Sequence, residues 1–502
     1  MPSLDIEREK GRNTMNKRNL TITLCAVFFF TFIPPSRAEK KLNILVYPFT
    51  NAGPNDYAWI AAGMTDTVIA DLGKIREITV ISERERRTVM KEIELVQSGA
   101  VRDSDVARVG TLTGAHAIFT GSYYVAGKKL RVITKLIDVE KGTIDRAGKV
   151  DGTLDDLISL QDRIVLDLLA DTEKTSIGKV RPPKISEESR KRVTAQRKTD
   201  PKAFELYSRG LTVHDTEPLK ALDYYKNALR ADPDYFDAAN RLIILLTELN
   251  RFPEAAKLLE RTEKSFRDAG EENTLNYAVL LTNAGLLHRL RGNIAGARDY
   301  YGRAEELYIS LKFDDTADYA ALLGDIGQLY WDRNDLDRAL EYYEKARALR
   351  LRLGLENSRE YAELMNNMGL VHWSRKQYDL ALRHYAMGQN IMETMKLRRT
   401  KRYASLMNNI GLTYWSQDDH VNALAYYEKA GEVWEALGME TTADYATLMF
   451  NMGVLYHKKR NDPCRGAEFM DRCRAIMKKI NHADAESYNT YYGIVKKACD
   501  RR

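Results

Sequence analysis

A block of twelve residues occurs five times in the second half of the chain, and successive copies are 42 residues apart. Each block opens with a tyrosine and carries a glycine eight residues later. The tyrosines are Tyr277, Tyr319, Tyr361, Tyr403 and Tyr445, and the glycines are Gly285, Gly327, Gly369, Gly411 and Gly453. Self-similarity at a fixed period of this length predicts a solenoid, in which every repeat stacks on its neighbours.

Each repeat predicts a hairpin of two helices. In the second copy, apolar residues recur at helical spacing on both sides of a polar break at Asn334-Asp335. Gly327 falls inside the first of these helices, where glycine costs about 1 kcal/mol relative to alanine. Because a glycine is kept there five times, we expect another helix to approach too closely for a Cβ atom.

The second helix of each repeat carries alanine and paired aromatic residues, and Ala297, Ala339, Ala381 and Ala423 keep the 42-residue step. This combination resembles the tetratricopeptide repeat. The phrases Leu364-Met-Asn-Asn-Met-Gly369 and Leu406-Met-Asn-Asn-Ile-Gly411 resemble the long-period variety of kinesin light chains. Upstream, Gly210 and Ile244 are 34 residues apart, which is the ordinary period. We therefore predict two repeats of 34 and five of 42 residues over 201–480, closed by a capping helix at 481–502.

The sequence pattern of residues 39–178 differs from that of the repeats. Short apolar runs near 42–49, 77–82, 116–125, 128–139 and 143–150 predict strands, separated by turn residues and by helical patterns. The fold class predicted for the chain is thus an α/β N-terminal domain followed by an all-α tetratricopeptide-repeat solenoid.

The α/β segment also resembles a family. Its motifs Val80-Ile-Ser-Glu-Arg-Glu-Arg86, Gly110 to Ser122 and Leu136 to Gly142 are similar to the core of the CsgG curli-assembly family and its TolB-like and flagellar relatives. That resemblance implies a bacterial periplasmic or outer-membrane setting. The lipid-anchor cysteine of the CsgG channel is missing, and Tyr124 and Lys128 are too close to enclose a pore hairpin. The resemblance therefore implies fold and compartment, and not secretion-channel activity.

The first 38 residues have the layout of a secretory signal peptide. Lys17-Arg18 precede an apolar run from Leu20 to Ile33, and Ser36-Arg37-Ala38 has the small-residue style of a cleavage site. We expect export to the periplasm or the periphery of the outer membrane. A retained signal anchor is the alternative, although the run is short for a membrane span.

Charge restricts the partners. The net charge of +6 over 502 residues is small and predicts no nucleic-acid partner. Residues 179–200 carry eight basic and three acidic side chains, and we interpret them as a basic, solvated linker. Weak contact of this linker with an anionic surface is the other interpretation.

Catalytic and cofactor motifs are not found in the sequence. The stretch from Gly121 to Gly127-Lys128 departs from a phosphate loop, because five residues separate the glycines and Lys129 stands where serine or threonine is required. His288 and His372 occupy a repeat position held elsewhere by tyrosine, so we interpret them as packing residues. We expect no catalytic residue, no metal site and no cofactor.

Two periodic sets are candidates for partner binding. A polar residue precedes each repeat glycine by two positions, and in the repeat family this position faces the concave groove, where an amide can donate to and accept from a peptide backbone. This set is Asn283, Asp325, Asn367, Asn409 and Asn451. The alternative is hydrogen bonding between neighbouring repeats. Trp331, Trp373 and Trp415 follow the glycines by four positions, either as ligand anchors or as packing between repeats.

Three cysteines follow the signal segment, at 464, 473 and 499. If a disulfide forms, we predict Cys464–Cys499, because the two residues lie at similar distances from the turn expected near Ala483 between antiparallel helices. Cys473 is less well matched in register.

These features predict a non-enzymatic, exported scaffold of the bacterial cell envelope that binds a protein or peptide in the concave repeat groove. It would take part in an envelope or outer-membrane assembly. The rival hypothesis is an envelope enzyme, or a nucleotide- or polymer-binding protein, that acts through residues 39–178.

Overall fold

The computed structural model describes residues 41–81, 110–111, 113–154, 156–169, 177, 180, 184–194, 199–458, 461–480 and 485–501. The predicted signal segment and the Ser82–Arg86 part of the CsgG-like motif lie outside these residues. All of the described residues belong to one compact unit.

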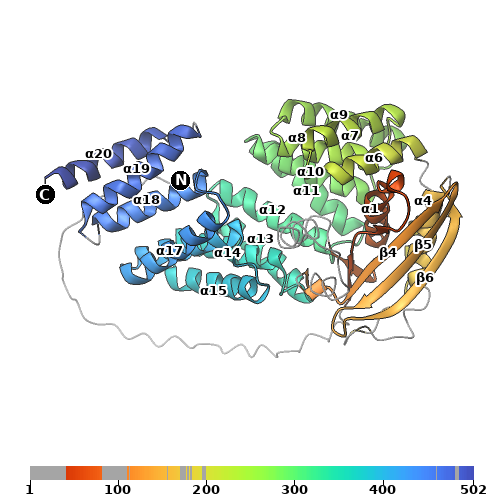
Figure 1. Cartoon of the computed structure of the whole chain (residues 1–502), viewed down its shortest axis with the longest axis horizontal. Helices are drawn as coiled ribbons and strands as arrows, with labels where there is room; N and C mark the ends of the chain where they lie inside the picture. The colour runs from red at the N-terminus through yellow and green to blue at the C-terminus, as the bar shows by residue number, and fades with distance from the viewer. Residues whose placement is uncertain are drawn as a thin grey trace, which may run out of the picture. The chain divides into compact units, whose positions relative to one another are not determined.

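The N-terminal region forms a mixed six-stranded sheet in the order β3-β1-β4-β5-β6, with β2 paired to β4. β1 is parallel to β3 and β4. The β4-β5 and β5-β6 pairs are antiparallel (Figure 1). The strands are β1 Leu42–Val46, β2 Thr50–Asn51, β3 Ile78–Val80, β4 Ala117–Ala126, β5 Lys129–Asp138 and β6 Thr143–Thr153.

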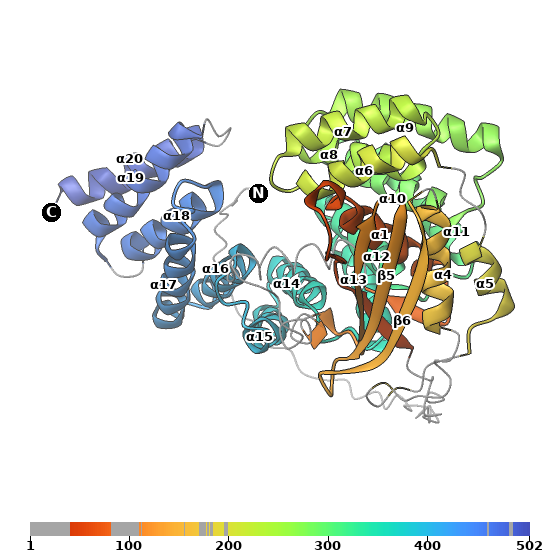
Figure 2. The ribbon, with the colours of Figure 1, turned by 45° about the vertical axis from the view of Figure 1, so that its right-hand side comes forward.

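Two helices pack on this sheet. A short 3-10 turn, η1 (Asn55–Tyr57), leads into α1 (Ile60–Gly73), and α4 (Leu157–Leu169) follows β6 (Figure 2). α1 contacts β1, β2 and β3, while α4 contacts β5 and β6. One face of α1 is entirely shielded from solvent, because Ile60, Met64, Val68 and Leu72 are each 0% exposed. The predicted α/β domain is therefore confirmed as a fold class.

Part of the predicted solvated linker is folded. Residues Glu187–Thr194 form helix α5, in which Ser189 and Val193 are buried. The carboxylate of Glu77, next to β3, accepts hydrogen bonds from the Ser186 amide (3.0 Å) and the Ser189 hydroxyl (2.7 Å). The helix packs through Val193 and through the Ser189 hydroxyl one turn earlier, and the high charge of this stretch obscured both.

The repeats fold as helical hairpins, as predicted. The two short hairpins are α6 (Pro201–Val213) with α7 (Pro218–Ala231), and α8 (Phe236–Glu248) with α9 (Phe252–Ala269). The five long hairpins are α10 (Leu275–Leu290) with α11 (Ile294–Ser310), α12 (Ala317–Asp332) with α13 (Leu336–Arg352), α14 (Arg359–Ser374) with α15 (Tyr378–Thr394), α16 (Lys401–Ser416) with α17 (His420–Ala436), and α18 (Ala443–Lys458) with α19 (Pro463–Lys479).

The periodic tyrosine marks the first turn of each long repeat. A threonine or serine three residues earlier caps the helix, and its hydroxyl accepts a hydrogen bond from the tyrosine amide. In α12 the cap is Thr316 and the bond from Tyr319 is 3.3 Å; in α14 the cap is Ser358 and the bond from Tyr361 is 3.2 Å. The caps keep the helix starts in register from one repeat to the next.

The periodic glycine allows close packing inside the hairpin. A Cβ atom added to Gly327 would lie 2.6 Å from two ring carbons of Tyr343, and one added to Gly411 would lie 2.6 Å from Tyr427. Gly285 and Gly369 meet Tyr301 and Tyr385 in the same way, and Gly453 meets Met470. The prediction that a second helix leaves no room for a Cβ is confirmed.

A pair of rings links the two helices of each long hairpin near their connecting turn. The pairs are His288–Tyr300, Tyr330–Tyr342, His372–His384, Tyr414–Tyr426 and Tyr456–Phe469, with ring centroids 5.0–5.6 Å apart. The interpretation of His288 and His372 as packing residues is therefore confirmed. In the third long hairpin, both rings are imidazoles and they stack within 8° of parallel.

Helix α20 (Ala485–Asp500) covers the last hairpin, in the place of the predicted cap. Tyr488 and Tyr491 of α20 pack on Phe450 of α18, with ring centroids 4.9 and 5.5 Å apart. Val495 is fully buried in a small cluster with Ala467 and Met470 of α19. α20 thereby shields an apolar face that the last hairpin would otherwise expose.

Candidate functional site

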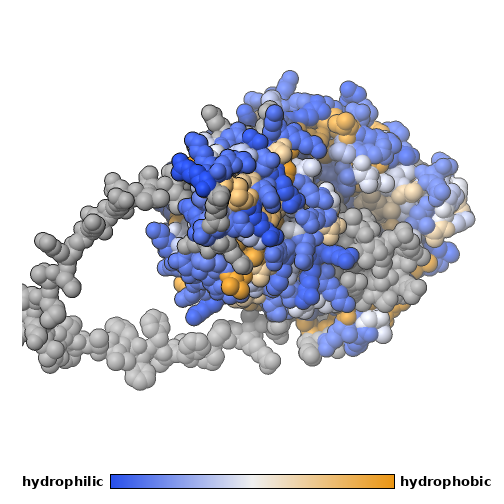
Figure 3. All heavy atoms as spheres, turned by 60° about the vertical axis from the view of Figure 1, so that its left-hand side comes forward, coloured by the Kyte–Doolittle hydropathy of each residue, from blue (hydrophilic) through white to orange (hydrophobic). Residues whose placement is uncertain are grey.

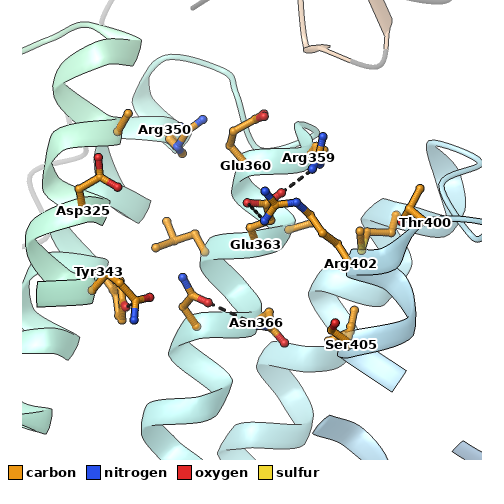
Figure 4. Close-up of a pocket in the computed structure, with 18 of the residues that line it drawn as sticks. Asp325, Tyr343, Arg350, Arg359, Glu360, Glu363, Asn366, Thr400, Arg402 and Ser405 are labelled. Carbon is orange, nitrogen blue, oxygen red and sulfur yellow. Dashed lines mark hydrogen bonds and ion pairs between the residues drawn. The ribbon is translucent and has the colours of Figure 1, made fainter. Parts of the chain in front are cut away.

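A groove runs across the first helices of three successive long repeats. Its cavity of about 720 Å³ is lined mainly by α12, α14 and α16, with contributions from α10, α13, α15 and α18 (Figure 4). The floor on α12 is made of small residues, Ala320, Ala321 and Gly324. Asn366 and Asn367 of α14 and Ser405 of α16 supply polar groups. The repeats thus present a recess that is open to a polar ligand.

The predicted polar set divides between this groove and the packing of the repeats. Asp325 and Asn367 line the cavity, whereas Asn283, Asn409 and Asn451 are not among its lining residues. The side-chain amides of those three each donate a hydrogen bond to an asparagine of the preceding repeat. The acceptors are Asn240 (2.8 Å), Asn366 (2.9 Å) and Asn408 (3.0 Å).

The hydrogen bonds form a ladder of amides along the inner side of the array. Two rungs join the residue two positions before one repeat glycine to the residue three positions before the previous one, as Asn409 joins Asn366 and Asn451 joins Asn408. The third rung joins Asn283 to Asn240 of the second short repeat. Both interpretations of this polar position, groove lining and contact between repeats, therefore have support in the structure. Asn366 serves both roles, since it accepts the Asn409 bond and lines the cavity.

The position three residues before the glycine was missed from the sequence. It is occupied by Thr282, Gly324, Asn366, Asn408 and Phe450, so it has no constant residue type. Gly324 and Asn366 nevertheless line the groove. A comparison of the repeats searches for a constant residue type, so this position gave no signal in the sequence.

Charged side chains border the groove and are paired across helices. Glu363 of α14 forms ion pairs with Arg359 of the same helix (2.9 Å) and with Arg402 of α16 (2.6 Å). Lys401 pairs with Asp444 of α18 at 2.8 Å. Arg359 and Glu363 have side chains only 6% and 25% exposed, so their charges need these partners.

Tyr343 links the hairpin packing to the groove, since its ring lies against Gly327 and also lines the cavity. Its hydroxyl donates a hydrogen bond to Gln328 Oε1 at 3.3 Å. Burial raises the pKa of Tyr343 well above that of a free phenol, which keeps the hydroxyl neutral.

The predicted tryptophans lie away from the cavity. Trp331, Trp373 and Trp415 are half-buried and pack against the core of the array. Trp373 donates its indole N–H to Ser416 Oγ of the following repeat at 3.2 Å. Of the two roles considered for this set, packing between repeats is the one that these contacts favour.

The structure brings the two predicted cysteines together. Cys464 at the start of α19 and Cys499 near the end of α20 form a disulfide, with Cα atoms 4.7 Å apart. Cys473 is free and 1% exposed, and burial raises the pKa of its thiol to about 12. Formation of the bond in the living cell remains a prediction.

The described residues contain no group of three or more histidine, cysteine or acidic side chains placed to hold a metal ion. Gly127-Lys128 lies in the tight turn between β4 and β5. None of the helices that the structure describes is long and apolar enough to cross a bilayer. The face drawn in Figure 3 is largely hydrophilic, with scattered hydrophobic residues.

Comparisons with known proteins agree with the repeat assignment. Family models described as tetratricopeptide repeat match residues 318–394, 402–479 and 215–272. A curated relative, "Putative adenylate cyclase 3" of Rhizobium meliloti (strain 1021), is 25% identical over 221 residues, or 43% of this chain. The chain spans about a third of the length of that relative.

Two solved structures are similar to part of the chain. The apo form of RapI is 14% identical, with a TM-score of 0.44, and the match covers 56% of this chain and 98% of RapI. BtubC (BKLC) from P. vanneervenii is 21% identical, with a TM-score of 0.38 and coverage of 46% and 92%. From the family models and its own helical hairpins, the chain carries tetratricopeptide repeats, a fold that serves protein–protein interaction, behind an α/β N-terminal region.

Proposed function

We propose that the protein is a non-enzymatic scaffold of the bacterial cell envelope that binds an extended segment of a partner protein in the groove of α12, α14 and α16. The observation that carries this proposal is the cavity of about 720 Å³ on successive repeats, with amide side chains on its wall. Concave surfaces of solenoids are suited to extended ligands because each repeat adds one more row of contacts.

The side chains of the groove match a peptide backbone. Asn366, Asn367 and Gln328 carry amides, which can both donate and accept hydrogen bonds. The lining includes five basic and four acidic residues, so its charge is nearly balanced. Since the charges of Glu363, Arg402 and Lys401 are already paired, the groove favours a segment of low net charge.

Blocking the groove tests the proposal. Ser405→Trp would place a large ring in the cavity, whereas Asn390→Trp changes an exposed residue of α15 outside the groove lining. We expect a partner recovered from envelope extract by the full chain, and then purified, to lose at least tenfold in affinity with Ser405→Trp and to keep its affinity with Asn390→Trp. Equal affinities for the two variants would remove the groove from the binding site.

The role of the predicted asparagines is refined by their contacts. Asn367→Ala should weaken binding of the partner without changing the urea midpoint of the array. Asn409→Ala should lower the urea midpoint, because its amide donates to Asn366. If Asn367→Ala binds the partner with unchanged affinity, this residue is not part of the site.

Location in the envelope is part of the proposal, and it rests on the signal-like layout of residues 1–38 and on the CsgG/TolB-like motifs of residues 39–178. We expect export and cleavage after Ala38. Sequencing the N-terminus of the mature protein is the test. An intact Met1 or Met15 in a cytosolic fraction would refute export.

The rival function is nucleotide or polymer binding by residues 39–178. The observation that favours it is the name of the relative from Rhizobium meliloti. A thermal-shift titration of the full chain with ATP and Mg²⁺ separates the two functions. A saturable rise in melting temperature would favour the rival, and no shift at millimolar ATP would favour the scaffold.

A further inference from the structure

The ladder of amides has a missing rung where the groove is open. In the intact part of the ladder, Asn409 Nδ2 donates to Asn366 Oδ1, a residue 43 positions earlier in the sequence. The same step leads from Asn367 back to Gly324, which has no side chain to accept a bond. Among the described residues, the side-chain amide of Asn367 accepts a bond from Asn366 and donates none. Both Asn367 and Gly324 line the cavity, so the gap in the ladder faces the groove.

The next step toward the N-terminus also lacks a pair of amides. Asp325 stands at the position of the donating asparagines, and an ionised carboxylate accepts hydrogen bonds without donating them. Thr282, 43 residues earlier, donates its hydroxyl to the Ala278 carbonyl of its own helix at 2.9 Å. Asp325 lines the cavity beside Gly324. In this row of side chains, α12 therefore presents an acceptor next to an empty position.

The packing of the chain does not require a glycine at position 324. A Cβ atom there would meet nothing within 4 Å, whereas one on Gly327 would lie 2.6 Å from ring carbons of Tyr343. Glycine inside a helix is also less favourable than alanine. The equivalent position of the other long repeats carries a side chain, from Thr282, Asn366, Asn408 and Phe450. Gly324 thus leaves open a space that a side chain takes in the neighbouring repeats.

Asn366 indicates which chemical group fits this space. Its Oδ1 accepts the bond from Asn409 at 2.9 Å, and its Nδ2 donates to Oδ1 of Asn367 at 3.4 Å. One amide thus joins two members of the row, as acceptor for one and as donor for the other. At position 324 the corresponding members are Asn367, which can donate, and Asp325, which can accept. Figure 4 shows Asp325 and Asn366 on the α12 and α14 sides of the cavity.

We propose that Gly324 sets the specificity of the groove: it leaves a gap that an amide group of the bound segment fills, accepting from Asn367 and donating to Asp325. This inference rests on the proposed function and names the group that the groove recognises. The amide comes from an asparagine or glutamine side chain or from the main chain, since both present the same donor and acceptor. A carboxylate there would lie against Asp325, and an alkyl group would leave Asn367 without an acceptor, so both are rejected.

Gly324→Asn closes the gap from within the chain, and Gly324→Ala is the matched control. Because a Cβ at this position meets nothing, both variants should fold. The new asparagine should accept the bond from Asn367. Asn367→Ala should therefore lower the urea midpoint in the Gly324→Asn background and leave it unchanged in the Gly324→Ala background. Equal effects of Asn367→Ala in the two backgrounds would show that the two positions do not meet, and would overturn the inference.

Peptides selected on the full chain from a phage-displayed random library are the probe for binding. Those that lose affinity with Ser405→Trp and keep it with Asn390→Trp are groove ligands. We expect these peptides to bind Gly324→Asn about tenfold more weakly than wild type, and Gly324→Ala nearly as tightly as wild type. Groove peptides that bind Gly324→Asn as tightly as wild type would overturn the inference and leave the proposed function standing. If no selected peptide depends on Ser405, both fail.

Changes in the peptide identify the source of the amide. Each asparagine or glutamine is replaced by alanine, and each main-chain amide is N-methylated in turn. One of these changes should weaken binding to wild type about tenfold and make the affinities for Gly324→Asn and Gly324→Ala equal. An effect of alanine assigns the amide to a side chain, and an effect of N-methylation assigns it to the main chain. If every altered peptide still distinguishes Gly324→Asn from Gly324→Ala, no amide fills the gap and the inference is wrong.

Discussion

Substitution of the repeat glycine in α12 tests how the hairpins are held together. In Gly327→Ala, the new Cβ would lie 2.6 Å from Cδ1 and Cε1 of Tyr343 and 3.2 Å from its Cγ. The ring is 1% exposed and cannot turn into solvent. Overpacking of this kind costs about 1 to 3 kcal/mol.

The same substitution also has a favourable component. Alanine is preferred over glycine inside a helix by about 1 kcal/mol. Gly324→Ala, three residues earlier in the same helix, receives this gain alone, because its Cβ meets nothing within 4 Å. The helix preference cancels when the free energies of unfolding of the two variants are subtracted. The difference should therefore equal the overpacking cost, about 1 to 3 kcal/mol.

Urea unfolding followed by circular dichroism measures this difference. Because repeat arrays can unfold in parts, hydrogen exchange in α12 and α13 should be measured together with the urea midpoints. In a Tyr343→Ala background, Gly327→Ala should no longer destabilise, since the ring is gone. If Gly327→Ala and Gly324→Ala are equally stable, the close approach of the two helices is not the reason for the glycine.

The remaining predictions concern pH, the disulfide and the ion pairs. Burial lowers the pKa of His384 and electrostatic repulsion from His372 lowers it further, while Glu344 opposes and Arg347 adds to the shift. The free energy of unfolding should therefore hold above the usual histidine range and fall below about pH 6.5. The urea midpoint at pH 5.5 against 7.5 measures this loss. His372→Tyr with His384→Tyr, which restores the ring pair of the neighbouring hairpins, should make the loss smaller, and the remainder includes His288, whose pKa burial also lowers. Reduction of Cys464–Cys499, which closes a loop of 35 residues, should cost about 3 to 4 kcal/mol and speed hydrogen exchange in α20, and non-reducing peptide mapping that finds three free thiols would refute the bond. Glu363→Gln should destabilise the array more than Glu341→Gln, whose ion pair with Lys345 is exposed, and equal urea midpoints would contradict the role given to burial.

Much of the array could be predicted because its information is local and repeated. The spacing of Gly327 and its equivalents indicated a close helix, and Tyr343 is the residue that approaches. Cys464 and Cys499 lie at similar distances from the turn expected between two antiparallel helices, and this match predicted the pair that the structure joins. Both inferences needed only helical rise and hairpin geometry.

The candidate site was harder to predict from the sequence because it depends on contacts between distant segments. Residues equivalent in the repeat differ in their contacts: Asn367 lines the cavity, whereas Asn409 donates a hydrogen bond to Asn366 of the preceding repeat. Asp66 of α1 and Arg241 of α8 form an ion pair, although they are 175 residues apart and carry no shared motif. The tryptophans gave no signal to choose between packing and binding, since both uses place an aromatic at the same spacing.

Site-specific photo-crosslinking in the cells that make the protein tests the groove most directly. A benzoyl-phenylalanine in place of Ser405 lies in the cavity between α14 and α16, and one in place of Asn390 lies outside the groove lining on the exposed side of α15. We predict that irradiation joins the Ser405 position, and not the Asn390 position, to one partner protein through a single extended segment. Adducts of equal yield at both positions, or none at Ser405, would contradict the assignment of the groove as the binding surface.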